Sequence, residues 1–270
     1  MKNPSIIALI VTFNPDERLL LSIGNLKDVV SHIVIVDNNS SDENFIKSLN
    51  DQIERALTIL NLSENFGIAY ALNHGIKYIL ERFSVDYILI LDQDTILIEK
   101  NLGKLIHDVE KCWSNVGIIS LGDRKIDKKN YFREAKYVIT SGSLIKREVL
   151  TKVRFRDEFF MDQVDFDFDF NVIKLGYSII SVTGHLIDHR LGIKLGRITY
   201  EPPIRFYYIV RNSTVLLLER KLPLSLYLFQ IINWSKALIL YDGLLKYIRV
   251  LSIGFFDGLK KNLGKKEKNF

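Results

Sequence analysis

Two carboxylates, Asp92 and Asp94, stand two residues apart directly after the apolar run of residues 88–91. A short run of Ile and Leu that ends in polar residues is typical of a buried strand, so both acids are expected at a strand end. Their oxygen atoms suit Mn²⁺ or Mg²⁺, ions that also bind the oxygens of a diphosphate. The alternative is that the two aspartates only shape the following turn, where aspartate is common.

Three other strand-like runs also end in polar residues: residues 6–11 before Thr12-Phe13-Asn14, 33–36 before Asp37-Asn38-Asn39-Ser40, and 58–62 before Ser63-Glu64-Asn65-Phe66-Gly67. Segments with helical spacing lie between the runs, over residues 18–30, 68–83 and 102–113. This alternation predicts an α/β fold with a mostly parallel sheet flanked by helices. Because parallel strands end along one edge, the four polar turns are expected to line one ligand-binding crevice.

Two of these turns have features that suit a nucleotide. Asp37 can accept a hydrogen bond from a ribose hydroxyl or a pyrimidine N–H; capping the next helix is the alternative, although Ser41 or Asp42 can serve there. Gly67 lets the backbone approach a ligand closely, and the helix that follows offers its first N–H groups to an anion. A dehydrogenase is excluded, because Thr12-Phe13-Asn14 does not match the G-x-G-x-x-G turn that follows the first strand of that class.

Residues 158–171 alternate aromatic and acidic side chains and include four aspartates: Asp162, Asp165, Asp167 and Asp169. A half-buried strand with a solvated acidic face explains the alternation. It does not explain the crowding, which costs repulsion and raises the pKa of neighbouring carboxyl groups. A carboxylate of that kind suits a general base that takes the proton of an attacking hydroxyl.

Two further residue types fit a bound diphosphate. A neutral imidazole, from His185 or His189, can complete an octahedral metal site, and a structural histidine is the alternative. The guanidinium of Arg211 matches phosphate geometry and would neutralise a diphosphate.

In order and spacing, four of these motifs resemble the family 2 glycosyltransferases, and within them the bacterial rhamnosyltransferase group, whose metal motif is commonly D-Q-D. The motifs are Val11-Thr12-Phe13-Asn14-Pro15, Val36-Asp37-Asn38-Asn39-Ser40, Asn65-Phe66-Gly67-Ile68-Ala69 and Leu91-Asp92-Gln93-Asp94. The resemblance covers residues 6–212. It implies a GT-A fold and a nucleotide-diphospho-sugar donor, with dTDP-rhamnose favoured.

The resemblance also implies roles for the donor side of the site. Four residues would surround the nucleoside, together with the Gly67 turn: Thr12, Asn14, Asp37 and Asn65. Asp92 would lie near the ribose and Asp94 would bind the metal. His189 matches the histidine that this family has shortly before Leu-Gly better than His185 does.

On the acceptor side, Asp165 matches the catalytic base of the family, with Asp162 and Asp167 as supports; an exchange of roles between Asp165 and Asp162 stays open. Ser141 and Gly142 resemble a turn that contacts donor or acceptor, with an ordinary loop as the alternative. The sequence departs from the family pattern at Asp169-Phe170-Asn171, where a run ending in arginine is more usual.

Charge is distributed unevenly along the chain, whose net charge is +5. From Arg205 to the end there are 12 Lys/Arg and 4 Asp/Glu, whereas the preceding residues have 25 and 28. An acidic body with a basic tail is expected where one end approaches an anionic surface. The lysines of the tail are interleaved with Leu, Ile and Phe, which favours lipid over nucleic acid.

Two domains are therefore expected: a GT-A domain over residues 1–212 and a basic amphipathic helical tail over residues 213–270. Charged residues such as Lys236 and Arg249 interrupt any apolar span of ~20 residues, so the tail is expected to lie on a membrane rather than cross it. Core packing or a homodimer interface is the alternative. The single cysteine, Cys112, and the absence of a secretory signal predict a cytoplasmic protein. The basic tail predicts that it lies at the inner face of the plasma membrane.

The sequence thus predicts an inverting glycosyltransferase that depends on Mn²⁺ or Mg²⁺. It would move a sugar from a nucleotide donor to a hydroxyl of a lipid-linked cell-surface glycan, with Asp165 accepting the proton in a single displacement. The competing hypothesis is a non-catalytic nucleotide-sugar-binding scaffold of a membrane glycan-assembly complex.

Overall fold

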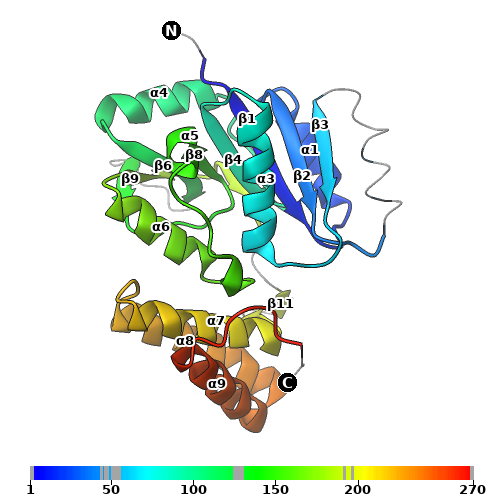
Figure 1. Cartoon of the computed structure of the whole chain (residues 1–270), viewed down its shortest axis with the longest axis vertical. Helices are drawn as coiled ribbons and strands as arrows, with labels where there is room; N and C mark the ends of the chain where they lie inside the picture. The colour runs from blue at the N-terminus through cyan, green and yellow to red at the C-terminus, as the bar shows by residue number, and fades with distance from the viewer. Residues whose placement is uncertain are drawn as a thin grey trace. The chain divides into compact units, whose positions relative to one another are not determined.

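A computed structural model describes residues 3–42, 45, 49, 56–123, 131–190, 193–195 and 198–267 (Figure 1). The chain forms two compact units, Met1–Phe155 with Phe168–Arg190 and Arg156–Asp167 with Leu191–Phe270. The boundary expected between residues 212 and 213 falls inside one helix, α7 (Pro203–Leu218), and needs correction. Because α7 is continuous and buried over most of its length, it cannot be divided between two domains.

The first unit is built on the four predicted strands, β1 (Ile6–Thr12), β2 (His32–Asp37), β3 (Leu57–Asn61) and β4 (Tyr87–Asp92). They are parallel neighbours, with β1 between β2 and β4 and β3 beyond β2. Every residue of β1 is buried, as expected of a strand covered on both faces.

Four later strands widen this sheet: β6 (Val116–Asp123), β7 (Phe132–Ala135), β8 (Ser143–Lys146) and β9 (Ser178–Thr183). The strand order is β3-β2-β1-β4-β8-β6-β9-β7. β8 runs antiparallel to β4 and β6, and β7 runs antiparallel to β9. The sheet is therefore mostly parallel, as predicted.

Helices cover both faces of the sheet. On one face, α1 (Arg18–Leu26) and α4 (Leu102–Cys112) share a core with alternate strand residues such as Ala8 and Ile10. On the other face, α3 (Ile68–Arg82) lies across β1 and β2 (Figure 1). A Cβ atom at Gly75 would collide with the Leu9 side chain, so the backbone of α3 packs directly on the strands there.

Two short strands bring distant segments together beside the carboxyl end of β4. β5 (Ile96–Leu97) follows the Asp92-Gln93-Asp94 turn and pairs antiparallel with β10 (Ile187–Asp188). The pairing places the residue that follows β10, His189, next to that turn. A short helix, α5 (Arg147–Leu150), follows β8, and α6 (Val164–Lys174) begins in the second unit and ends in the first. The alternating Phe and Asp residues are therefore helical.

The second unit is largely helical. After the hairpin of β11 (Ile193–Leu195) and β12 (Ile198–Tyr200), α7 is followed by α8 (Leu224–Asp242) and α9 (Leu244–Leu259). A 3₁₀ helix, η1 (Asp157–Phe159), also belongs to this unit. Among the helices of the described residues, none has both the length and the apolar character needed to cross a membrane.

Candidate active site

The carboxyl ends of β1, β2 and β4 meet at one edge of the sheet. Thr12 lies opposite Asp37 in the register of β1 and β2, and Val11 lies opposite Asp92 in the register of β1 and β4. The polar turns that follow these strands are therefore neighbours, which the alternation of strands and helices predicted.

Asp37 organises the turn after β2. Its carboxylate accepts hydrogen bonds from the Thr12 hydroxyl at 2.8 Å and from the Ser40 backbone N–H and hydroxyl at 2.8 and 2.5 Å. Asp37 therefore has a structural role in this turn as well as the predicted role in binding a ligand. A carboxylate offers about four acceptor positions, so three hydrogen bonds leave capacity for a ligand donor such as a ribose hydroxyl.

Asparagines connect the neighbouring turns. Asn14 has a left-handed backbone, with φ of 47°, and its side-chain oxygen accepts hydrogen bonds from the backbone N–H and hydroxyl of Ser41. Asn65 accepts from the N–H of Gly67 and from the amide of Asn38. Asn38 was not singled out from the sequence, yet it is buried and also accepts from Phe66 N–H, which ties the second turn to the third.

Asp92, Asp94 and His189 form a group of side chains in the first unit that could hold a metal ion. Each offers one ligand atom, and these atoms all lie within 4.8 Å of one another. His189 Nε2 lies 3.2 Å from Asp92 Oδ2 and 3.7 Å from Asp94 Oδ1. His185 is exposed, and the Leu191-Gly192 pair that favoured His189 in the sequence lies outside the described residues.

Electrostatics at this cluster favours a bound cation. Burial raises the pKa of Asp94, Asp92 adds to the rise, and His189 and Arg18 oppose it. Two carboxylates held close together repel each other, and a divalent cation between them would remove that cost. Two carboxylate oxygens and one imidazole nitrogen are a ligand set suited to Mn²⁺ or Mg²⁺.

Arg18, at the start of α1, joins the two segments that carry these ligands. Its Nε donates to the backbone oxygen of Asp94 at 2.6 Å, and its Nη2 donates to the backbone oxygen and the carboxylate of Asp188 at 3.1 and 2.7 Å. The Arg18 side chain is only 12% exposed. No motif in the sequence pointed to this residue.

Ser141 and Gly142 contact residues in and around the Asp92-Gln93-Asp94 turn. The Ser141 hydroxyl accepts a hydrogen bond from Asp92 N–H at 2.9 Å and contacts the Thr95 hydroxyl at 2.8 Å. Gly142 has φ of +82°, and a Cβ atom there would lie 2.7 Å from Ile187. Both residues are buried, so these contacts favour support over direct contact with an acceptor.

The predicted base lies in the second unit, in the first turn of α6. Asp165 accepts a hydrogen bond from Phe166 N–H at 2.9 Å. Unsatisfied N–H groups at a helix start stabilise a negative charge, which suits a carboxylate that must be ionised to accept a proton.

The other acids of the segment have cationic or backbone partners. Asp162 binds Arg205 through two hydrogen bonds, at 2.6 and 3.3 Å. Asp167 is buried and pairs with Lys221 at 2.7 Å. Within the first unit, Asp169 accepts from Val138 N–H. The repulsion expected from the crowding of these acids is therefore largely neutralised by their partners.

Arg211 is fully buried within the second unit, at 1% exposure. Its guanidinium donates to the backbone oxygens of Glu158, Phe159 and Gly264 and to the side chain of Asn212. All three of its nitrogens are thus engaged by protein oxygens. We therefore correct its predicted contact with a diphosphate to a structural role, because a phosphate would have to displace these bonds.

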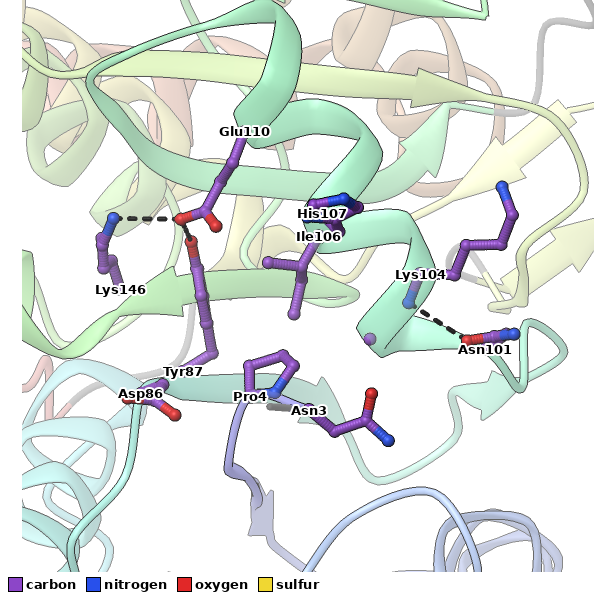
Figure 2. Close-up of a pocket in the computed structure, with 11 residues that line it drawn as sticks. Asn3, Pro4, Asp86, Tyr87, Asn101, Lys104, Ile106, His107, Glu110 and Lys146 are labelled. Atoms are coloured by element: carbon purple, nitrogen blue, oxygen red, sulfur yellow. Dashed lines mark hydrogen bonds and ion pairs between the residues drawn. The ribbon is translucent and has the colours of Figure 1, made fainter. Parts of the chain in front are cut away.

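A pocket of about 630 Å³ lies at the start of β4, the end opposite to the Asp92-Gln93-Asp94 turn (Figure 2). Glu110 of α4 accepts hydrogen bonds there from the Tyr87 hydroxyl and from Lys146, at 2.7 and 3.1 Å. Burial, followed by the contact with Glu110, raises the pKa of Tyr87. These contacts hold α4 against the sheet, and the residues that line the pocket include none of the predicted site residues.

A comparison with known proteins identifies the family to which this chain belongs. The model of the family described as "Glycosyl transferase family 2" matches residues 7–167, more than half of the chain. The chain belongs to glycosyl transferase family 2. The resemblance noted in the sequence is thereby confirmed, and the protein is a glycosyltransferase.

Relatives of this glycosyltransferase extend the comparison over nearly the whole chain. It is 28% identical over 290 residues to the dTDP-rhamnosyl transferase RfbF of Shigella flexneri, covering 96% of each chain. A mannosyltransferase from Pyrobaculum calidifontis, solved with GDP-Man and Mn²⁺, superposes with a TM-score of 0.60 at 15% identity, covering 93% of this chain and 75% of that one.

A second solved structure is TarS 1–349 of S. aureus in complex with UDP-GlcNAc. It superposes with a TM-score of 0.56 at 14% identity, covering 95% of this chain and 81% of that one. At 14% and 15% identity the likeness to these two structures shows the fold alone. The transferase has the expected GT-A fold, with additional helices at its C-terminal end.

Proposed function

We propose that this glycosyltransferase moves L-rhamnose from dTDP-rhamnose to a hydroxyl of a lipid-linked cell-surface glycan, with inversion at the anomeric carbon. The observation that carries the proposal is the cluster of Asp92, Asp94 and His189 at the sheet edge where the Asp37 turn also lies. A cation there would sit beside the expected nucleoside site, where it can reach a diphosphate.

The candidate metal ligands and the predicted base have different roles in this proposal. Asp92, Asp94 and His189 would hold Mn²⁺ or Mg²⁺, which when bound would neutralise the charge of the departing diphosphate. Asp165 accepts the proton of the acceptor hydroxyl as its oxygen forms the new bond to the anomeric carbon. The bond from that carbon to the diphosphate breaks in the same displacement, so the configuration inverts.

The proposed donor rests on the similarity of this chain to RfbF. RfbF of Shigella flexneri is named a dTDP-rhamnosyl transferase, and its similarity to this chain spans 96% of both proteins. The two superposed structures hold UDP-GlcNAc and GDP-Man, so the fold itself accepts different nucleotide sugars. The residues that surround the sugar must therefore make the choice.

A lipid-linked acceptor agrees with the surface of the second unit. Large apolar side chains of α8 and α9 are exposed, Leu245 at 85%, Leu240 at 63% and Phe229 at 60%. Basic residues accompany them, among them Lys236 and Arg249, which are also exposed. Exposed apolar surface with basic residues is suited to the interface of an anionic membrane. We propose that the enzyme acts as a peripheral protein at the cytoplasmic face of the plasma membrane.

In the competing proposal, a non-catalytic scaffold, the protein binds the donor but Asp165 does not act as a base. The two proposals differ in turnover. A panel of dTDP-, UDP- and GDP-linked sugars, assayed for transfer or hydrolysis with and without Mn²⁺, should give metal-dependent turnover that is greatest with dTDP-rhamnose. Donor binding without turnover in every combination would support the scaffold.

The same assay tests the base. Asp165→Asn should lower kcat by about 10²–10⁴-fold while the donor still binds. Asp162→Asn breaks the ion pair with Arg205 and should lower thermal stability as well as turnover. If Asp165→Asn has near-normal turnover, while Asp162→Asn folds stably but loses most of its turnover, then Asp162 is the base and Asp165 its support.

A further inference from the structure

The loop that precedes the proposed base has an unfavourable backbone conformation. Three of its four residues, Phe160, Asp162 and Gln163, have φ of 64°, 57° and 64°, and none of them is glycine. Left-handed backbone is disfavoured for such residues, because the Cβ atom crowds the following carbonyl oxygen. Gln163 is 8% exposed, and its side-chain oxygen has no hydrogen-bond partner among the described residues. The loop therefore needs contacts from outside to keep this shape.

Asn212 of α7 supplies these contacts. The two N–H groups of its amide donate to the backbone oxygens of Phe159, Met161 and Asp162, at N···O distances of 3.0, 2.8 and 2.9 Å, so one N–H is shared between two oxygens. The Asn212 side chain is completely buried. One side chain thus binds three carbonyl groups of the segment that contains the left-handed residues.

Arg211 fixes the orientation of that amide. Its Nε donates to the Asn212 side-chain oxygen at 2.9 Å, so the amide nitrogen must face the loop. The guanidinium also lies over the rings of Tyr207 and Tyr208, 5.5 and 4.8 Å from their centroids. Its bond to Gly264 at 2.6 Å ties the segment after α9 into the same network. The side chains of Arg211 and Asn212 are therefore both held in one orientation on α7.

We propose that Asn212, oriented by Arg211, is a positioning residue for Asp165. The left-handed residues end at Gln163, one residue before α6 begins, and Asp165 is the second residue of α6. A return of these residues to right-handed backbone would turn the chain and displace the Asp165 carboxylate. A displacement of about 1 Å can lower the rate of a reaction about 10²-fold. The inference rests on the proposed function, in which Asp165 is the base.

The test compares Asn212→Ala with Thr214→Val. Both positions are buried on α7, and Thr214 donates to Val210 within the helix. Asn212→Ala should lower kcat about 10–100-fold and leave the KM for the donor within about twofold, because the donor site belongs to the first unit. Thr214→Val should change both values by less than about twofold. Equal kcat in the two variants would overturn the inference.

A rescue experiment separates positioning from a general loss of stability. Gly tolerates a φ near 64° without strain, so Gln163→Gly should restore part of kcat in the Asn212→Ala background and change little in the wild type. Absence of rescue, with thermal unfolding as cooperative as in the wild type, would contradict positioning. If Asn212→Ala does not fold, Asn212→Ser, which retains a smaller donor, is measured against the same criteria.

Asp165→Asn distinguishes the two ways in which the idea can fail. If Asp165→Asn turns over normally, the proposed base is wrong. If Asp165→Asn is inactive while Asn212→Ala is as active as Thr214→Val, the proposed function stands and only the positioning role of Asn212 falls.

Discussion

Arg18 connects the two segments that carry the candidate metal ligands without being one of those ligands. It hydrogen-bonds the backbone of Asp94 and both the backbone and carboxylate of Asp188, the neighbour of His189. Groups that orient metal ligands in this way typically contribute about 10–100-fold to metal affinity.

We therefore expect Arg18→Ala to raise the Kd for Mn²⁺ at least about tenfold, and Arg18→Lys to give an intermediate value because an ammonium cannot reproduce the guanidinium fork. Electron paramagnetic resonance of free Mn²⁺ measures this without turnover. Arg82→Ala, an exposed arginine at the end of α3, is the control. Equal Mn²⁺ affinity in Arg18→Ala and Arg82→Ala would contradict the role.

For single residues, the sequence indicates the site best where a polar side chain directly follows an apolar strand. The predicted metal ligands, Asp94 and His189, lie together in the structure, and Asp92, which the resemblance placed near the ribose, lies beside them. Arg18 was missed because its partners lie 76 and 170 residues away, and only the pairing of β5 with β10 brings them close. The prediction for Arg211 was wrong because sequence does not tell whether a guanidinium meets phosphate or backbone oxygens.

At the scale of elements, the contact of α9 with α7 depends on two glycines. A Cβ atom at Gly258 would lie 2.6 Å from the backbone oxygen of Arg211, and one at Gly254 would lie 3.0 Å from that of Tyr207. Neither contact can be relieved by a change of side-chain rotamer, because the obstacle is backbone. The two helices would have to separate.

Gly258→Ala is therefore expected to destabilise the protein by about 1–3 kcal/mol. Gly24→Ala is the matched control, because Gly24 is also helical but has nothing within 4 Å of an added Cβ. That change should stabilise by up to about 1 kcal/mol, since Ala is the better helix former. Urea unfolding compares the two, and equal stability would contradict the close packing.

The elements of the first half could be predicted within a few residues, because each apolar run has polar residues at its end. The second half was harder. β7 and β8 were not recognised, since both are short, four residues each. The alternation of Phe and Asp in residues 158–171 indicated a half-buried strand, whereas residues 164–174 form the helix α6. In this helix Asp167 pairs with Lys221 and Asp169 accepts a hydrogen bond from Val138 N–H, contacts that the sequence does not reveal.

At the scale of the whole molecule, the exposed apolar surface of α8 and α9 is the feature that a water-soluble catalytic domain does not need. We expect the protein to sediment with vesicles that contain phosphatidylglycerol and less with phosphatidylcholine alone, because its C-terminal part is basic.

Leu245→Glu should weaken that binding at least about tenfold, since Leu245 is 85% exposed and a charge there opposes insertion. Leu21→Glu, at an apolar position of α1 that is 59% exposed, should have little effect. Vesicle binding that is unchanged in Leu245→Glu, together with a lipid-free dimer that this variant dissociates, would instead support the homodimer interface.

The proposed reaction requires one site that binds a divalent cation and a nucleotide diphosphate together. Mn²⁺ resonance, recorded with the wild type and with Asp94→Asn as dTDP is added, tests this most directly. We predict that dTDP lowers free Mn²⁺ with the wild type beyond what dTDP alone binds, and that Asp94→Asn abolishes the difference. An equal free Mn²⁺ signal with both proteins at every dTDP concentration would contradict the proposed site.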